Sequence, residues 1–211
     1  MGGALKREKE LFAVVEILGL KRSNIRLLRL PDLGLIQKLE ETVGLMVRIL
    51  EHVDPADVYV TAFEGGHPDH DCANFVVFEA RKRSQMSFRI IEFPLYNGSG
   101  SFFTWRWRIN AFPNDDGLEI KLPLTSLEVG IKHRIMRTYS SQWMYMVPAR
   151  LATPEEKMLR LGEPHRICGQ DRNHTIKPHP GKMNYERWFN LFMRIKFSDF
   201  VRAVEQISFL S

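Results

Sequence analysis

The sequence has little of what marks a secreted or membrane-spanning protein. Its 211 residues include two cysteines, Cys72 and Cys168, which cannot form a disulfide framework and are typical of a reducing compartment. No apolar run approaches the ~20 residues that cross a bilayer. The N-terminal stretch MGGALKREKELFAVV carries charges inside its apolar pattern, which indicates an amphipathic helix and not a signal peptide. We therefore expect a cytoplasmic protein without a membrane span.

Charge of one sign is not concentrated anywhere in the chain. The net charge is +5, from 30 Lys and Arg against 25 Asp and Glu, and the basic residues are spread along the sequence. A basic excess can serve an anionic substrate, a nucleic acid or a membrane surface, but this distribution favours an ordinary solvated surface. The stretch FFTWRWRINAF, residues 102–112, alternates arginine with aromatic residues and is compatible with base stacking. Its alternation favours a strand with one buried face, so we expect no nucleic-acid partner.

Hydrophobic periodicity predicts an α/β fold for the first half of the chain. Helical spacing is present at 4–19, from the break at 31–34 to about residue 53, and at 68–83. Strand patterns alternate with these helices at 24–30, 57–63 and 87–96. This order predicts a mostly parallel, Rossmann-like sheet flanked by helices. A doubly wound sheet normally opens with a strand, and this chain opens with a helix, so we expect the first strand to be missing.

A different pattern follows the glycine- and serine-rich stretch at 97–101. We predict that 102–112 and 117–123 form an antiparallel hairpin. Helices are predicted at 125–139, 154–161 and 184–208, and the His-, Pro- and Gly-rich stretch 163–183 is predicted to be a long loop. The aromatic stripe of the last helix indicates either core packing or a subunit contact, which leaves a homo-oligomer open: Trp188, Phe189, Phe192 and Phe197.

The stretch GGHPDHD, residues 65–71, is the strongest candidate for a functional site. It follows a predicted buried strand, and ligands of open α/β sheets bind at the carboxyl ends of the strands. His67 and His70 are three residues apart, so both can face one cleft, and Asp69 can orient an imidazole between them. Imidazole is a common zinc ligand, and a catalytic zinc needs about three protein ligands plus water. The alternative is a polar helix start with two exposed histidines.

These residues resemble the second signature of the LmbE-like, or PIG-L, family of zinc-dependent N-acetylglucosaminyl deacetylases. Three more stretches are similar to the family in the same order: LKREKELFAVVEILGL, LRLPDLGL and KHRIMRTYSSQ. The resemblance covers about residues 2 to 145. It implies one LmbE-like domain over 1–211, with a family-like core at about 1–145 and a C-terminal extension at 146–211.

The resemblance also implies roles for individual residues. His70 would be a zinc ligand, His67 would stabilise an oxyanion or assist proton transfer, and Asp69 would tune His67. Arg7 and Asp32 would hold the sugar. The implied reaction is the hydrolysis of an N-acetyl group on an amino-sugar conjugate, and the implied cofactor is zinc. A non-catalytic carbohydrate-binding or interaction protein derived from this fold remains the alternative.

The sequence departs from the family at its start. The family opens with a strand ending in Ala-His-Pro-Asp-Asp-Glu, which supplies two further metal ligands and a carboxylate base, and this string is absent here. We therefore expect zinc to bind weakly or not at all, and a fragment, a late-start gene model and a decayed homologue stay open. The loop residues His165, Cys168, His174 and His179 have suitable side chains but no recognisable metal-binding spacing.

Overall fold

The computed structural model describes residues 2–99, 108–114, 117–144, 147, 151, 154–187 and 195–208. The chain forms two compact units. Unit 1 consists of Met1–Arg29 with Lys121–Glu163, and unit 2 consists of Leu30–Ile120 with Pro164–Ser211. The single family-like domain over residues 1–211 stays a prediction.

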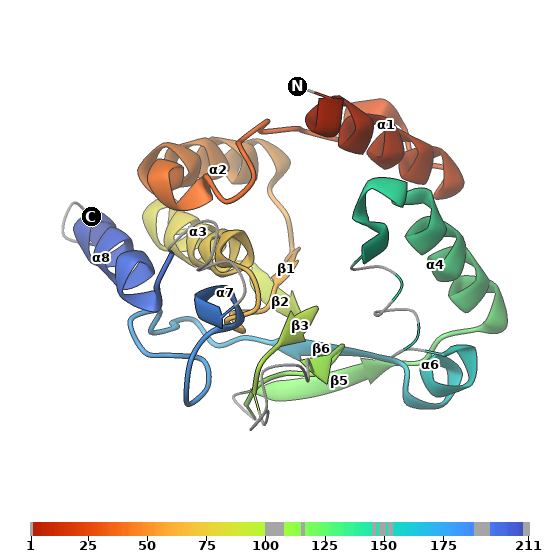
Figure 1. The fold of residues 1–211 in the computed structure, drawn as a ribbon. Coiled ribbons are helices and arrows are strands. Elements are labelled where there is room, and N and C mark those ends of the chain that lie inside the picture. Colours follow the sequence, from red (N-terminus) through yellow and green to blue (C-terminus); the bar gives the residue numbers. More distant parts are fainter. Residues whose placement is uncertain are drawn as a thin grey trace. The chain divides into compact units, whose positions relative to one another are not determined.

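The main sheet has four strands in the order β1-β2-β6-β5 (Figure 1). Their bounds are β1 Asp57–Thr61, β2 Arg89–Phe93, β6 Glu163–Ile167 and β5 Leu118–Leu122. β1 and β2 are parallel, with Asp57 opposite Arg89 and Thr61 opposite Phe93, whereas β2 and β6 are antiparallel. Because β2 lies between two strands, three successive residues of its sequence RIIEF are buried without alternation, namely Ile90, Ile91 and Glu92. A separate two-stranded ladder joins β3 (Tyr96–Asn97) to β4 (Arg108–Ile109).

Helix α3 (Pro68–Ser84) places the GGHPDHD stretch in space. His67 is its N-cap in an extended conformation, and Pro68 occupies the first turn, where a missing N–H costs nothing. Acidic residues in the first turn and three basic residues in the last turn complement the helix dipole. The helix ends where Gln85 adopts φ +56°. The local sequence therefore specifies both where this helix begins and where it ends.

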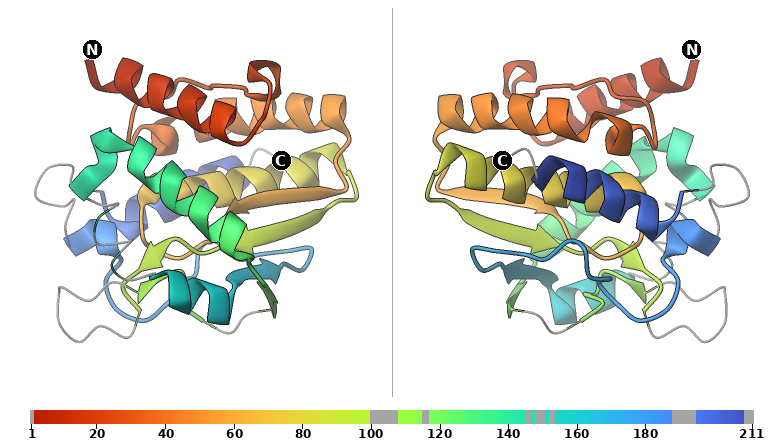
Figure 2. Two further views of the ribbon diagram at one scale, coloured as in Figure 1. Left: turned by 90° about the vertical axis from the view of Figure 1, so that its right-hand side faces the viewer. Right: turned by 90° about the vertical axis from the view of Figure 1, so that its left-hand side faces the viewer.

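The core of unit 2 lies between α3 and its neighbours. A short 3-10 turn, η2 (Leu35–Lys38), leads into α2 (Leu39–Val53), which packs against α3, and α8 (Phe197–Ser208) lies beside both (Figure 2). The buried side chains at their contact include Val43, Phe75, Val76, Phe200 and Val204. A second cluster joins α2, α3 and the sheet through Leu50, Val60, Val77 and Ile90. Full burial of each such side chain contributes roughly 1.5–3 kcal/mol, so this core fixes α3 against the sheet.

Unit 1 is helical. It contains α1 (Gly2–Ile17), η1 (Arg22–Asn24), α4 (Ser126–Thr138), η3 (Ser140–Gln142) and α6 (Glu155–Leu161). Thr125 caps α4, and its hydroxyl and backbone N–H form a reciprocal capping box with Glu128. The Glu10 carboxylate of α1 accepts hydrogen bonds from the Ser140 hydroxyl at 2.9 Å and the Ser141 N–H at 2.8 Å. These bonds tie α1 to the end of α4.

The structure corrects several predictions about individual elements. The strand predicted at 24–30 was wrong, because this stretch has no ladder partner in the part of the chain that the structure describes and Arg29 adopts φ +52°. The predicted pairing of 102–112 with 117–123 was also wrong for the described residues, because β4 pairs with β3 and β5 lies next to β6. Residues 101–107 lie outside the described part of the chain. An alternating pattern needs a neighbouring strand, and the sequence does not say which neighbour is available.

Two corrections concern the C-terminal third. The predicted loop at 163–183 begins with β6, which is an inner strand of the sheet. The residues Glu163-Pro164-His165 are unusual in an inner strand, so the sequence did not indicate one. The predicted helix at 184–208 is described as α7 (Asn184–Arg187) and α8. Of its aromatic stripe, Phe197 is in the core, and Trp188, Phe189 and Phe192 lie outside the described residues. Among the helices that the structure describes, none has the length and apolar character needed to cross a bilayer.

Candidate functional site

The candidate site is the corner where the chain leaves β1 and enters α3. Gly65 adopts φ +68°, a conformation that side chains with a Cβ rarely take. A Cβ on Gly66 would overlap the backbone carbonyl oxygen of Tyr96, which follows β2. Both glycines are buried. Glycine at position 65 accommodates the positive φ, and glycine at position 66 lets the turn pack directly against the Tyr96 backbone.

Two buried carboxyl groups hold this corner. One oxygen of Asp71 accepts the N–H groups of Glu64 and Gly65, each at 3.1 Å. Glu64 in turn accepts the N–H groups of Leu95 and Tyr96, each at 3.0 Å. Burial raises the pKa of Glu64 to about 8 and the pKa of Asp71 to about 7, although the N–H donors oppose this rise. The two groups therefore connect the end of β1 to α3 and to the segment after β2.

His67 and Asp69 lie at the start of α3. The Nδ1 atom of His67 accepts the Asp69 N–H at 3.2 Å. The Asp69 carboxylate accepts the N–H groups of Leu33 and Leu35, at 2.7 and 3.2 Å. The pKa of Asp69 is raised because burial, the largest effect, outweighs the opposing effect of the nearby His67. Asp69 therefore ties the 33–35 turn to the site while it interacts electrostatically with His67.

His70 lies beside His67, with 4.9 Å between the ring centroids, so the structure brings the predicted pair together. Tyr96 packs edge-on against His70 at 5.8 Å. The Nδ1 atom of His70 is buried and has no hydrogen-bond partner among the described residues. Burial, followed by the neighbouring His67, lowers the pKa of His70 to about 3. The His70 ring is therefore neutral near pH 7.

The two predicted sugar-holding residues lie in different units. Asp32 is exposed and belongs to unit 2, and its charge helps to raise the pKa of Asp69. Arg7 belongs to unit 1, where its Nε and Nη2 lie 2.9 Å from the Gln142 amide oxygen in the orientation that satisfies both groups. Asp32 is thus a neighbour of the histidine corner, and the relation of Arg7 to that corner stays a prediction.

A buried ionic network supports the site from the sheet side. The Glu92 carboxylate on β2 accepts hydrogen bonds from Arg166 Nη2 at 2.6 Å and from Arg172 Nη2 at 3.1 Å. Its other oxygen accepts Asn74 Nδ2 at 2.7 Å, and Asn74 also donates to the Thr61 carbonyl at 2.8 Å. The side chains of Arg166 and Glu92 are 1% and 0% exposed. This network joins α3, the end of β1 and the C-terminal loop.

The four C-terminal residues considered for metal binding have separate surroundings. His165 packs edge-on against Tyr59 at 5.7 Å, and the Cys168 thiol receives a contact from Arg172 Nη2 at 3.6 Å. His174 is buried and bonds through Nε2 to the Asn74 amide oxygen at 2.9 Å. His179 is also buried, but its Nε2 has no partner among the described residues.

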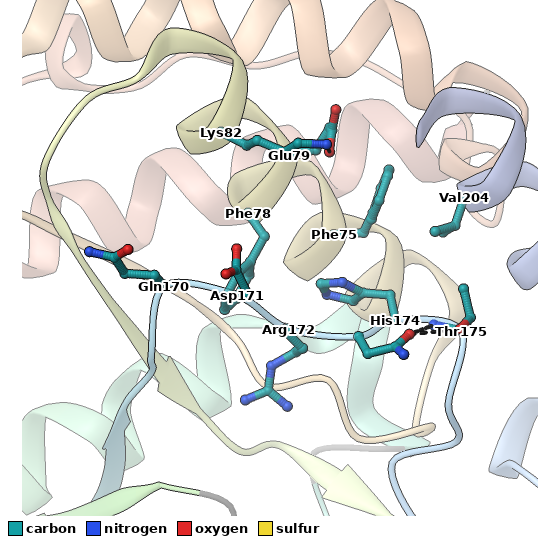
Figure 3. Close-up of a pocket in the computed structure, with 11 residues that line it drawn as sticks. Phe75, Phe78, Glu79, Lys82, Gln170, Asp171, Arg172, His174, Thr175 and Val204 are labelled. Atoms are coloured by element: carbon teal, nitrogen blue, oxygen red, sulfur yellow. Dashed lines mark hydrogen bonds and ion pairs between the residues drawn. The ribbon is translucent and has the colours of Figure 1, made fainter. Parts of the chain in front are cut away.

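A cavity of about 300 Å³ lies along α3 at some remove from its N-terminus (Figure 3). Phe75, Phe78 and His174 form its apolar side, and Glu79, Lys82 and Asp171 are among its polar residues. None of the site residues predicted from the sequence lines it. Burial lowers the pKa of His174 to about 3, and its hydrogen bond to Asn74 is made. His174 is therefore a satisfied structural histidine at the wall of this cavity.

The residues of the corner do not make up a complete zinc site. His70 offers a neutral imidazole with a buried, unpartnered nitrogen, which suits a metal ligand. Within the described ranges, however, no group of three His, Cys, Asp or Glu side chains is arranged to hold a metal ion. A catalytic zinc needs about three protein ligands, so the described residues alone do not fit it.

Sequence reasoning missed Glu64, Asp71, Tyr96 and the segment around His179. Glu64 and Asp71 flank the recognised histidines, but nothing in the sequence shows that their carboxyl groups are buried. His133 is half-buried, and its Nε2 atom has no partner among the described residues. The Cys72 thiol is buried, and burial raises its pKa well above the usual value.

Comparison with known proteins agrees with this architecture. Residues 2–81 match the model of the family PIG-L, described as GlcNAc-PI de-N-acetylase. No curated protein is similar enough to count as a match. Among solved structures, a zinc-inhibited form of teicoplanin deacetylase Orf2 is similar at 13% identity, with a TM-score of 0.51 over 79% of this chain and 76% of that one.

A second similar structure is the conserved protein TT1542 from Thermus thermophilus. It has 21% identity and a TM-score of 0.52, over 80% of this chain and 76% of that one. At these identities the two structures speak for the fold, and they confirm the predicted α/β sheet flanked by helices. Together with the family match at residues 2–81, they confirm the predicted resemblance of this chain to the LmbE-like, or PIG-L, family.

Proposed function

We propose that this protein hydrolyses the N-acetyl group of an N-acetylglucosamine conjugate or a related amide. The observation that carries the proposal is the pair His67 and His70, with ring centroids 4.9 Å apart at the carboxyl end of β1. The family matched by residues 2–81 is described as a de-N-acetylase, and one protein of similar fold is a deacetylase. Ligands of open α/β sheets bind at this position, which supports placing the substrate there.

In this proposal His67 stabilises the developing oxyanion. Because its Nδ1 accepts the Asp69 N–H, the proton of the neutral ring resides on Nε2. Nε2 can therefore donate a hydrogen bond to the carbonyl oxygen of the amide as negative charge develops there. Asp69 supports this role through its charge and through the backbone N–H that orients the ring.

His70 takes the role of the metal ligand in the proposal. Its burial keeps the imidazole neutral, which is the form that binds a cation. Zinc is the metal that the family resemblance implies. Because the described residues do not complete a zinc site, no step of the reaction is derived through the metal. Asp32 and Arg7 are proposed to hold the sugar.

The test is a deacetylation assay on an N-acetylglucosamine conjugate, with and without added zinc, for the natural chain and its variants. We expect His70→Ala and His67→Ala each to lower the rate by at least about 10²-fold, the usual loss on removing a catalytic acid, base or oxyanion donor. His52→Ala is the matched control, because His52 is an exposed histidine of α2 and its loss should leave the rate unchanged.

Hydrolysis that survives His70→Ala would contradict the metal role of that residue. Binding of the conjugate by the natural chain without release of acetate, in both zinc conditions, would support a non-catalytic carbohydrate-binding protein instead. Loss of folding in either variant is excluded by comparing their thermal unfolding with that of His52→Ala.

A further inference from the structure

The C-terminal segment 179–184 packs against the glycine turn of the candidate site. The His179 Nε2 atom lies 3.2 Å from the position that a Cβ on Gly65 would occupy, and the Met183 sulfur covers the same position. The Asn184 N–H donates to the Gly65 carbonyl at 2.8 Å. A segment far away in the sequence therefore forms one side of the turn that carries His67.

The hydrogen bond of His179 fixes which of its nitrogens carries the proton. Nδ1 lies 2.9 Å from the Pro180 carbonyl oxygen. A carbonyl oxygen can only accept, so Nδ1 must be the protonated nitrogen. Burial lowers the pKa of His179, which favours the neutral ring. Nε2 is therefore a bare acceptor, and it has no donor among the described residues.

His174, the other buried histidine of the C-terminal loop, differs from His179 in this respect. Its Nε2 is bonded to the Asn74 amide at 2.9 Å, beside the cavity drawn in Figure 3. His174 and His179 are 4% and 3% exposed, yet of these two only His179 has an unused nitrogen. Leaving a buried polar atom unpaired is costly, so such atoms in native proteins call for a ligand, an ion, an ordered water or a functional role.

Asn184 supplies a donor to match. Its backbone is fixed to Gly65, and its side-chain oxygen packs against Gly98. Its Nδ2 is buried and also lacks a partner among the described residues. An unpaired acceptor beside Gly65 and an unpaired donor, on a side chain that packs against Gly98, thus come from one C-terminal segment.

We propose that His179 and Asn184 are further substrate-binding residues of this site. His179 Nε2 accepts a hydrogen bond from the acetamido N–H or a hydroxyl of the amino sugar, and Asn184 Nδ2 donates to one of its oxygens. The inference rests on the proposed amino-sugar substrate.

Two substitutions at His179 separate hydrogen bonding to substrate from loop packing. Asparagine retains a donor for the Pro180 carbonyl at the place of Nδ1 and has no acceptor at the place of Nε2. Glutamine places an amide, with its acceptor oxygen, at the position of Nε2. We expect His179→Asn to weaken the binding of N-acetylglucosamine about tenfold, as one lost hydrogen bond implies, and His179→Gln to keep it within about threefold.

The measurement is titration calorimetry with N-acetylglucosamine on the full chain, with thermal unfolding of each variant alongside. His174→Asn is the control, and we expect it to lower the unfolding temperature without changing the dissociation constant. Equal dissociation constants for the natural chain and His179→Asn would overturn the inference, as would the absence of binding by the natural chain. Binding that depends on His179 without any hydrolysis would support the inference and count only against the proposed deacetylation.

Discussion

Two buried glutamates, Glu92 and Glu64, lie near the candidate site, and their carboxyl groups have different kinds of partner. Glu92 in β2 is paired with two guanidinium groups, from Arg166 and Arg172, at 2.6 and 3.1 Å. Glu64 follows β1, and its partners among the described residues are N–H donors, from Leu95, Tyr96 and the Asn97 amide. Both side chains are inaccessible to solvent. The same residue type in the same layer of the fold therefore has a cationic environment in one case and a dipolar one in the other.

The difference teaches what each glutamate contributes. The charge of Glu92 is compensated, so it holds the sheet and the C-terminal loop together through ion pairs. No cation compensates the charge of Glu64 among its described partners. Burial therefore raises its pKa to about 8, so near pH 7 the carboxyl group mostly carries a proton. Glu64 is a neutral hydrogen-bond acceptor that holds the segment after β2 at the glycine turn, whereas Glu92 is an anion between two cations.

The largest expected loss of stability comes from removing the charge of Glu92. In Glu92→Gln, two guanidinium groups lose their anion, and the Arg166 side chain is only 1% exposed. Removing one partner of a buried ion pair typically costs about 3–5 kcal/mol of unfolding free energy, because the remaining charge stays buried and unpaired. Urea unfolding measured at pH 7 tests this value.

The control for that experiment is Glu40→Gln. Glu40 also binds an arginine, Arg83, at 2.6 Å, but its side chain is 52% exposed. A surface ion pair contributes about 0–1 kcal/mol to the free energy of unfolding, so the control substitution should change it little. Similar losses in the two variants would show that burial does not distinguish these ion pairs.

The next effect comes from moving the backbone that Glu64 holds. In Gly66→Ala the new Cβ would overlap the Tyr96 carbonyl, and Tyr96 must shift away from Glu64. Overpacking of this kind typically costs about 1–3 kcal/mol. Gly130→Ala is the control, because nothing lies within 4 Å of a Cβ at that helical position and the exchange should not destabilise the protein. Unfolding in urea, compared between the two variants, gives the answer.

The smallest effect, and the sharpest test of the comparison, comes from Glu64→Gln. A neutral amide resembles the protonated carboxyl group, so the loss at pH 7 should stay below about 1 kcal/mol. The pKa of Glu64 is raised from 4.5 to about 8 on folding. The proton it retains therefore stabilises the folded state fully below pH 4.5, and this contribution is lost as the pH rises through 8.

The pH dependence of unfolding should accordingly differ between the two proteins. Between pH 4.5 and 8 the natural chain loses stability that Glu64→Gln retains, so the variant has the flatter profile. Asp71, whose pKa is also raised, to about 7, adds a slope of its own in both proteins, and its charge is one of the causes that raise the pKa of Glu64. Parallel profiles would mean that Glu64 is ionised in the folded state and that the contrast with Glu92 fails.

The sequence predicted the parts of the site that local patterns specify. The strand at 57–63, the two glycines and the helix start at Pro68 are close to the observed β1, turn and α3, and they bring His67 and His70 together. It could not predict the strand β6 or the role of Arg166. An arginine in a loop-like stretch is usually exposed, and only its pairing with Glu92 makes its burial tolerable.

What the sequence determined by itself is the local geometry of the histidine turn. Proline at the first helical position, acidic residues beside the N-terminus and glycine at a positive φ act through neighbouring bonds and need no distant partner. Only the tertiary structure decided which polar groups are buried, which of them are paired, and which segment closes the Gly65 corner. These properties depend on contacts between residues far apart in the chain, such as Glu92 with Arg166 and Gly65 with Asn184, and no local pattern encodes them.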